Sequence, residues 1–326
     1  MKNLASVIGA ILAGLSVAAM AQSERSADTY PSKPIRLIVP YAASGPTDLV
    51  ARVLGQKLNE RFGQQVVVDN RGGANGIIGM ELAAKAPSDG YTLLLGGAGV
   101  LASNPAFYSK LPYDAQKDFA PISLMTAAPL LLVVTPTLGV KTVPELVKLA
   151  RSQPDKLSFG SGGIGGVAHL AGELLNYMTG VKTVHIAYKG AGPALTDLLG
   201  ERIAFTVTST VSSMPFVKTG KLIGLGVTSA KRATSLPDIP AIGESIPGYE
   251  VRAWYGLLAP AKVPRPIIDK LNREISVIIQ APEVVQRFAA DGGEAVGGPP
   301  EDFAKVISQE IAMWTKLAKD TNLKFE

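Results

Sequence analysis

Residues 35–62 read IRLIVPYAASGPTDLVARVLGQKLNERF, and this stretch decides the fold. Its first six residues are an apolar run typical of a buried strand, and the small residues of 41–46 follow as a loop. From residue 47 apolar side chains return at helical spacing until Gly63 ends the pattern. The face that they form consists of Leu49, Val50, Val53, Leu54 and Leu58. The stretch predicts a strand, a short loop and a helix, which is the repeating unit of an α/β protein.

The same unit recurs along the chain, and a second set begins near residue 130. Apolar runs predict further strands over 66–68, 91–95, 130–134, 157–159, 184–188, 203–207, 222–227 and 254–259. Helical spacing predicts helices over 77–86, 142–152, 167–178, 193–199, 265–280, 282–290 and 300–317. Thr142 and Glu145 form a capping-box pattern at the start of one of these helices. A loop is expected over 208–213, and the stretch 228–251, rich in Pro, Gly and Ser, is expected to be a connection.

The N-terminus is typical of an exported protein. Lys2 precedes an apolar run over 4–20 and the motif Ala19-Met-Ala21. This order is the layout of a cleavable secretory signal peptide. A membrane anchor is the alternative, but the run is short and rich in Ala, Gly and Ser. We therefore expect a signal peptide over 1–21 and a flexible lead-in over 22–30.

Composition excludes several classes of protein. The 326 residues include no cysteine and two histidines, and the formal net charge is +5. The lack of cysteine excludes disulfides and thiolate metal sites. Lys and Arg are spread along the chain without a basic tract, so nucleic-acid binding is not expected. His169 and His185 lack the spacing of a metal pair, and neither a metal nor another cofactor is expected.

Signals for catalysis are weak. Gly160-Ser-Gly-Gly-Ile-Gly165 matches G-x-G-x-x-G, but the next strand does not end in the acidic residue that a dinucleotide site needs. A G-x-S-x-G nucleophile motif does not occur. Ser161 and His169 would be the nucleophile and base of a hydrolase, yet no acid is placed to orient the base. The sequence favours a binding protein, with the hydrolase as an alternative.

Glycine-rich loops follow several predicted strands. They cover residues 41–46, 69–76, 96–99, 160–166 and 189–192. In open α/β sheets, ligands bind outside the carboxyl ends of the strands. Several of these loops lead into helices, whose free N–H groups and positive dipole ends favour anions. The loops predict a site in which main-chain donors hold a carboxylate.

The sequence at these loops resembles the Bug or TctC family, the periplasmic receptors of tripartite tricarboxylate transporters. YPSKPIRLIVP (30–40) is similar to the opening strand of the family, and VDNRGGANG (68–76) to its second ligand loop. SGPTD (44–48) resembles the family's G-G-x-x-D loop, and WYGLLAP (254–260) continues the match. Further matching segments are 89–96, 104–105, 111–114, 118–121, 169–173, 188–190, 193–200, 220–222 and 227–232.

The resemblance implies an α/β periplasmic binding protein of the Venus-flytrap type, type II-like, with a ligand cleft between two lobes. Lobe I would contain 31–124 and 250–326, and lobe II would contain 125–249. The family binds small organic carboxylates and delivers them to a membrane permease, so the mature chain is expected in the periplasm, as a monomer. A sensor subunit of a membrane signalling system is the alternative.

The resemblance also implies the residues of the ligand site. Lobe I would contribute Tyr41, Ala43, Ser44, Thr47, Asn75, Gly97 and Ala98. Lobe II would contribute Ser161, Gly162, Gly165, His169, Tyr188, Lys189, Thr208 and Ser209. Many relatives have Asp-Asn where this chain has Thr208 and Ser209, and such an Asp could pair with an ammonium group. We therefore expect a non-amino ligand, such as an aliphatic or aromatic diacid.

Overall fold

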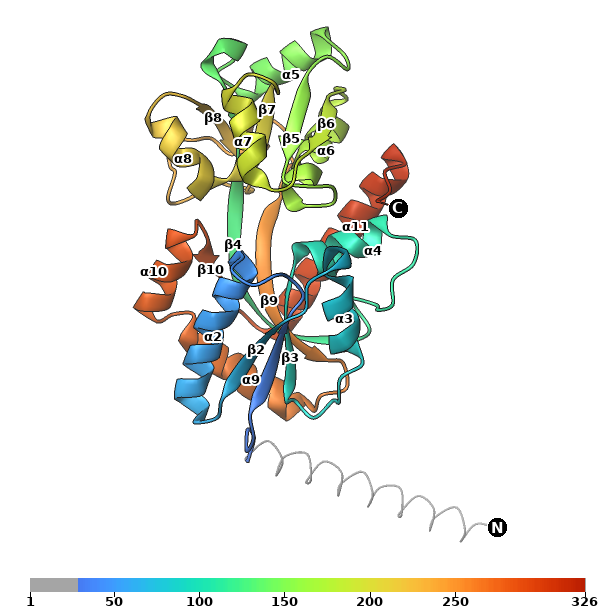
Figure 1. The fold of residues 1–326 in the computed structure, drawn as a ribbon, viewed down its shortest axis with the longest axis vertical. Helices are drawn as coiled ribbons and strands as arrows, with labels where there is room; N and C mark the ends of the chain where they lie inside the picture. The colour runs from blue at the N-terminus through green and yellow to red at the C-terminus, as the bar shows by residue number, and fades with distance from the viewer. Residues whose placement is uncertain (1–28, 326) are drawn as a thin grey trace, which may run out of the picture.

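The computed structural model describes residues 29–325 and divides them into two lobes (Figure 1). The signal peptide expected over 1–21 lies outside these residues, as does most of the expected lead-in. Tyr30, at the end of that lead-in, is buried, and its hydroxyl donates to the carbonyl oxygen of Gly90 at 2.8 Å. Among the residues described, no helix is both long and apolar enough to cross a lipid bilayer.

The sheet of lobe I begins with three parallel strands, β1 (Ile35–Val39), β2 (Val66–Asn70) and β3 (Thr92–Gly97). They lie in the order β2-β1-β3, and β9 (Arg252–Pro260) then runs antiparallel to β3. The short strand β10 (Glu294–Ala295) pairs with β4 (Phe119–Val134). The surrounding helices are α2 (Pro46–Phe62), α3 (Ile77–Ala84), α9 (Arg265–Ile278) and α10 (Pro282–Ala290).

Lobe II has the same plan. Its strands β5 (Ser158–Ser161), β6 (Val184–Ala187) and β7 (Phe205–Ser209) are parallel, and β8 (Ile223–Val227) pairs with β4. Its helices are α5 (Val143–Ser152), α6 (Val167–Thr179), α7 (Ala191–Leu199) and α8 (Thr210–Lys218). The order of the strands places β7 between β4 and β5, with β6 at the edge.

Two long strands connect the lobes. β4 has 16 residues, of which 119–129 pair with β9 and 130–134 pair with β7. In Figure 1, β4 and β9 run side by side across the gap between the lobes. The last helix, α11 (Pro300–Thr321), packs on β4 and reaches lobe II, where Tyr177 of α6 donates to Asp320 at 2.5 Å. The connection is therefore a pair of strands supported by a helix.

Each lobe has a core of apolar side chains between its sheet and helices. In lobe I, Leu37 and Leu93 of the sheet pack with Leu54 of α2 and Leu271 of α9, all fully buried. In lobe II, Phe159 and Phe205 stack at 5.4 Å between ring centroids. Of the apolar face expected for α2, Val50, Leu54 and Leu58 are buried in this core. Val53 is only partly buried against it, and Leu49 lines a groove instead.

The structure differs from the sequence expectations at several elements. The strand expected over 130–134 is only the end of β4, because Pro121 and Pro129 interrupt the pattern; Pro121 lies at a register shift and Pro129 where the pairing with β9 ends. The loop expected over 208–213 is wrong: β7 continues to Ser209 and α8 begins at once. The glycines at 96–99 do not form an open loop, since a π-helical turn (Gly99–Ser103) and α4 (Asn104–Phe107) follow directly.

Two further expectations concern loops and caps. The connection over 228–251 is irregular as expected, yet it contributes to the core through Tyr249, which is buried and donates to the carbonyl oxygen of Ala171 at 2.8 Å. At α5 the Thr142 hydroxyl accepts the N–H of Glu145 at 3.3 Å, while the Glu145 carboxylate accepts the N–H of Lys141. The helix start is confirmed, with the return bond one residue earlier than in the standard pattern.

Candidate functional site

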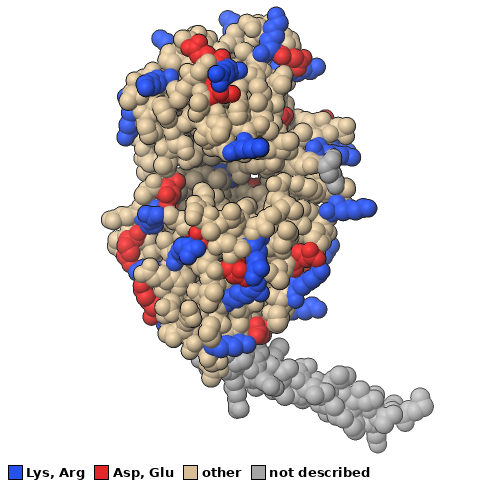
Figure 2. Space-filling view, in the orientation of Figure 1, with Lys and Arg blue, Asp and Glu red and all other residues tan. Residues whose placement is uncertain are grey.

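A cleft of about 970 Å³ lies between the two lobes. Figure 2 shows it as a hollow across the middle of the molecule. It is lined from lobe I by the β1–α2 and β2–α3 loops and the turn after β3, and from lobe II by the loops that precede α6, α7 and α8. The lining residues are Pro40, Tyr41, Ala42, Pro46, Gly72, Gly73, Asn75, Gly76, Gly99, Asn104, Leu130, Gly162, Gly163, Ile164, Gly165, Gly166, Val167, Ala168, Ala191, Thr208 and Ser209.

The walls of this cleft carry no formal charge. Its lining residues, all within 29–325, are glycines, apolar residues and a few neutral polar side chains. The polar groups among them are the hydroxyls of Tyr41, Thr208 and Ser209 and the amides of Asn75 and Asn104. The Asn104 amide donates to the carbonyl oxygen of Asn75 at 3.0 Å, which ties the turn after β3 to the β2–α3 loop. A ligand in the cleft would therefore meet main-chain groups and neutral side chains.

Three helices of lobe II direct their N-termini at the cleft. Helices α6, α7 and α8 begin after Gly166, Gly190 and Ser209, and in the described chain none of these caps makes a side-chain hydrogen bond. None of the three has an acidic residue in its first turn. Their first N–H groups lack helical partners, and their own first turns supply no carboxylate to offset the positive ends of their dipoles. Near α8, Asp291 lines a groove together with Ser209 and Val211. An anion in the cleft would satisfy the free N–H groups and offset the dipoles.

The first turn of α2 in lobe I is different. Asp48 lies there, buried, and it accepts the N–H of Ser44 at 2.9 Å and the Arg52 side chain at 2.9 Å. Despite burial, hydrogen bonds from Arg52 and Ser44 hold the pKa of Asp48 below its ordinary value. The carboxylate thus already offsets the positive end of this helix dipole. Ser44 has a positive φ of 68°, a backbone conformation that glycine adopts more readily than serine.

Glycine is required where the loops approach one another most closely. Gly76 has a φ of 84°, and a Cβ there would lie 2.4 Å from Val100 and 3.0 Å from the carbonyl oxygen of Pro40. Gly165 has a φ of 79°, and a Cβ there would lie 2.8 Å from the Phe325 ring. The bare backbone at these positions leaves main-chain groups accessible from the cleft.

The structure brings together six of the fifteen residues expected at the site: Tyr41, Asn75, Gly162, Gly165, Thr208 and Ser209 line the cleft. Ser44 lines a neighbouring groove together with Arg52, Arg287 and Asp291. This groove adjoins the cleft, because Pro46, Ala191 and Ser209 line both. The exposed residues Ala43 and Lys189 lie in loops that border the cleft. The remaining residues are Thr47, Gly97, Ala98, Ser161, His169 and Tyr188, which lie behind its lining. Their roles as ligand contacts stay predictions.

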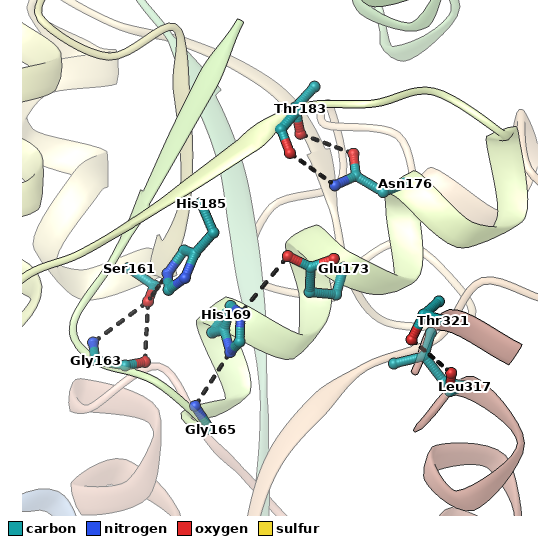
Figure 3. A network of polar contacts seen from close by, with 10 residues as sticks. All are labelled: Ser161, Gly163, Gly165, His169, Glu173, Asn176, Thr183, His185, Leu317 and Thr321. Atoms are coloured by element: carbon teal, nitrogen blue, oxygen red, sulfur yellow. Dashed lines mark hydrogen bonds and ion pairs between the residues drawn. The ribbon is translucent and has the colours of Figure 1, made fainter. Parts of the chain in front are cut away.

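A buried polar cluster lies beneath the loop over 160–166 (Figure 3). The Ser161 hydroxyl lies 2.7 Å from Nε2 of His185. The imidazole rings of His185 and His169 stack with their centroids 3.8 Å apart. Nδ1 of His169 accepts the N–H of Gly165 at 3.1 Å, and Nε2 lies 3.6 Å from the Glu173 carboxylate. Burial, followed by the proximity of His169, lowers the pKa of His185 to about 4.

This cluster gives Ser161 a structural role. Its hydroxyl is 1% exposed and lies within hydrogen-bond distance of His185 and of the Gly163 carbonyl oxygen, not of His169. The hydrogen bond between Ser161 and His169 that a hydrolase would need is therefore absent among the described residues. The cluster holds the glycine loop from behind and presents its backbone to the cleft.

All five glycine-rich stretches named from the sequence contribute residues to the cleft lining, but many other lining residues were missed. Asn104 and Ala168 lie just beyond the glycine stretches, and Leu130 comes from the crossing strand β4. Their residue types carry no signal for a binding site, so only their position relative to the glycine-rich loops could have indicated that they line the cleft. Among residues 29–325, no group of three or more His, Asp or Glu side chains is arranged to hold a metal ion.

Comparisons with known proteins agree with this geometry. Residues 50–323 match the model of the tripartite tricarboxylate transporter family receptor. The chain is 39% identical over 317 residues to a UPF0065 protein from the tcbD–tcbE intergenic region of Pseudomonas sp. strain P51, covering 96% of this chain and 94% of the relative. It is 36% identical to the protein BugT of Bordetella pertussis over 328 residues, covering 100% and 99% of the two chains.

Solved structures give the same result. Rpa4515 of R. palustris, with adipate, superposes with a TM-score of 0.77 at 36% identity and covers 90% of this chain and 99% of its own. MatC of Rhodopseudomonas palustris, with bound malate, gives 0.73 at 30% identity, covering 88% and 99%. The periplasmic binding protein BugD gives 0.73 at 34% identity, covering 90% and 99%. The two-lobed binding fold expected from the sequence is confirmed.

Proposed function

The chain belongs to the tripartite tricarboxylate transporter receptor family, and from this premise we propose that it captures a small organic carboxylate in the periplasm and presents it to a membrane permease. The observation that carries the proposal is the set of three uncapped, acid-free helix N-termini around an uncharged cleft. Such helix ends bind anions through main-chain N–H groups and dipoles. The adipate and malate in the two related structures support a carboxylate as the anion.

The ligand is proposed to lack an ammonium group. An amino acid would need a carboxylate to pair with its ammonium, and no Asp or Glu lines the cleft among the residues described. Thr208 and Ser209, at the end of β7, offer only hydroxyls. A buried ammonium without a partner would be costly. An aliphatic or aromatic acid therefore fits better than a zwitterion.

Capture requires no chemistry on the solute. The Ser161 hydroxyl is buried and bonded within lobe II, and its neighbour His185 has a pKa lowered to about 4. The proposed action is closure of the lobes about β4 and β9, as in other hinged binding proteins. Ser161→Ala should leave organic acids chemically unchanged, as the original protein does; product accumulating with the original protein and not with the variant would support the hydrolase.

A charge placed at one helix N-terminus tests the proposal. Ala168 lies in the first turn of α6 and lines the cleft, so Ala168→Asp puts a carboxylate where the anion would bind. An acidic residue in a first turn favours the helix, so the variant should fold. Two like charges about 5 Å apart repel enough to weaken binding at least tenfold. Isothermal titration with a panel of organic acids measures the change.

Ala281→Asp at the N-cap of α10 is the matched control, because it adds the same charge to a helix start that does not line the cleft. Binding of an acid by this control with unchanged affinity, together with its loss in Ala168→Asp, is the expected result. Equal binding by both variants, or tighter binding of a zwitterionic amino acid than of any simple acid, would contradict the proposal.

A further inference from the structure

A short tail after α11 places an aromatic ring against lobe I. Asn322 caps the helix with a left-handed φ of 54°, and residues 323–325 follow it. The ring of Phe325 stacks on that of Phe107 in α4, with 4.4 Å between centroids, and its backbone N–H donates to the carbonyl oxygen of Phe107 at 3.4 Å. Tyr108 meets the same ring edge-on at 6.1 Å. Lobe I therefore anchors the tail.

The same ring also touches lobe II. Phe325 packs on the backbone of Gly165 so closely that a Cβ there would lie 2.8 Å from the ring. The ring of His169, in α6, lies 5.8 Å from it between centroids. Gly165 lines the interlobe cleft, whereas Phe325 is not among the described residues that line it. The ring therefore joins the two lobes beside the cleft and not within it.

The loop that Phe325 contacts has few side chains to hold it in place. Five of the seven residues over 160–166 are glycine, and the Ile164 side chain is 56% exposed. Glycine has the most backbone freedom to lose, so the position of such a loop depends on contacts from outside it. Nδ1 of His169 supplies one by accepting the N–H of Gly165. The ring of Phe325 adds a second contact at the same glycine, from outside lobe II.

The lobe I side of this contact is connected to the opposite wall of the cleft. The Tyr108 hydroxyl accepts the amide N–H of Asn75 at 2.6 Å, and Asn75 lines the cleft. Asn104, at the start of α4, lines it as well. A continuous set of contacts thus runs from Asn75 through Tyr108 and Phe325 to Gly165. It links residues that face the cleft from opposite lobes.

We propose that Phe325 is a positioning residue for the cleft: its ring joins the lobes at one edge and holds the loop over 160–166 in place before a ligand arrives. Binding then need not order the loop, which lowers the entropic cost of association. This inference rests on the proposed function, because the loop leads into the N-terminus of α6, where the anion would bind. Its effect on the ligand-free protein is measurable without any solute.

Hydrogen exchange in the ligand-free protein tests the positioning of the loop. Phe325→Ala should speed exchange of the amides of residues 162–168 by about three- to tenfold, the range expected for the loss of one aromatic contact. The amides of β1, in the core of lobe I, should stay within about twofold of the original rates. Phe325→Leu keeps an apolar side chain without a flat ring, so it should fold and still speed exchange at the loop. Lys324→Ala is the matched control, because that side chain is exposed on the same tail, and it should change neither set of amides.

A distance measurement tests the link between the lobes. The chain has no cysteine, so spin labels can be attached after Lys110→Cys, just beyond α4, and Lys148→Cys, on α5 of lobe II, where both side chains are exposed. Double electron–electron resonance on the ligand-free protein should show a broader distribution of distances when Phe325→Ala is added. The same labelled pair with Lys324→Ala should give the original distribution.

Titration connects the loop to binding. Each acid that binds the original protein, from a panel that includes adipate and malate, should bind Phe325→Ala about three- to tenfold less tightly and Lys324→Ala equally well. Unchanged affinity, an unchanged distance distribution, or exchange that is unchanged at the loop would overturn the inference. Equal acceleration at the loop and in β1 would also overturn it, because that result shows only a loss of global stability. Failure of every acid to bind the original protein would overturn the proposed function, and the exchange and distance results would still decide the role of Phe325.

Discussion

Glu310 makes the free energy of unfolding decrease as the pH rises. It lies on α11 with its carboxyl against the crossing strand β9, where the indole N–H of Trp254 donates to it at 2.7 Å. Burial raises the pKa of this carboxyl from 4.5 to about 7, although the bond from Trp254 opposes the shift. The folded state therefore holds the proton more tightly than the unfolded state. Its contribution to stability is fully present below about pH 4.5 and is lost as the pH rises through 7.

The size of the effect follows from the shift. Each unit of pKa difference corresponds to about 1.4 kcal/mol. Allowing for the partial exposure of the side chain, ionisation of Glu310 between pH 5 and pH 8 should cost roughly 2 kcal/mol. Glu310→Gln keeps an oxygen that can accept from Trp254 but cannot ionise. The Tm of the variant, relative to the original protein, should thus rise by roughly 3 °C from pH 5 to pH 8.

The assay is thermal unfolding by circular dichroism of both proteins across this pH range. All other titrating groups are shared and cancel in the difference between the two curves. Glu301→Gln on the same helix is the control, because bonding to Arg265 lowers the pKa of that exposed carboxyl, so it remains ionised throughout the range. Parallel Tm curves for Glu310→Gln and the original protein would refute the reasoning.

Three other perturbations have predictable outcomes. Gly172→Ala would place a Cβ 2.2 Å from the Phe159 ring and should lower the free energy of unfolding by about 1–3 kcal/mol in urea, whereas Gly192→Ala, with open space around it, should not. His185 has a pKa lowered to about 4, so its contribution to stability is present above about pH 6.5 and is lost as the pH falls towards 4. The urea midpoint of His185→Gln should therefore fall less steeply over this pH range than that of the original protein. An equally steep fall in both proteins would contradict the lowered pKa. Thr142→Ala removes the cap of α5 and should cost about 1 kcal/mol, measured by chemical denaturation, and no loss would show that the cap contributes nothing.

Local patterns in the sequence were sufficient for most of the helices and strands and for the glycine-rich stretches that line the cleft. The spacing of apolar residues over 35–62 gave the strand, loop and helix, because burial on one face imposes the same period on any sheet-packed helix. The glycine-rich stretches indicated where the backbone faces the cleft. Only glycine adopts a positive φ without strain where a neighbouring segment lies close to the backbone, as at Gly76 and Gly165. The full length of β4 was not predictable, because Pro121 and Pro129 mask a strand that pairing with β9 and β7 stabilises.

The tertiary structure alone decided which side chains meet. Ser161 was paired with His169 from their closeness in sequence, but the parallel pairing of β5 with β6 places His185 beside Ser161 instead. A small pocket beside the crossing strands likewise joins residues from α2, β4, β9 and α10, which are far apart in the chain. Local periodicity records whether a side chain is buried, whereas its neighbours depend on strand pairing between distant segments. The sequence therefore determined the glycine-rich stretches that line the cleft, and strand pairing decided which side chains lie around and beneath them.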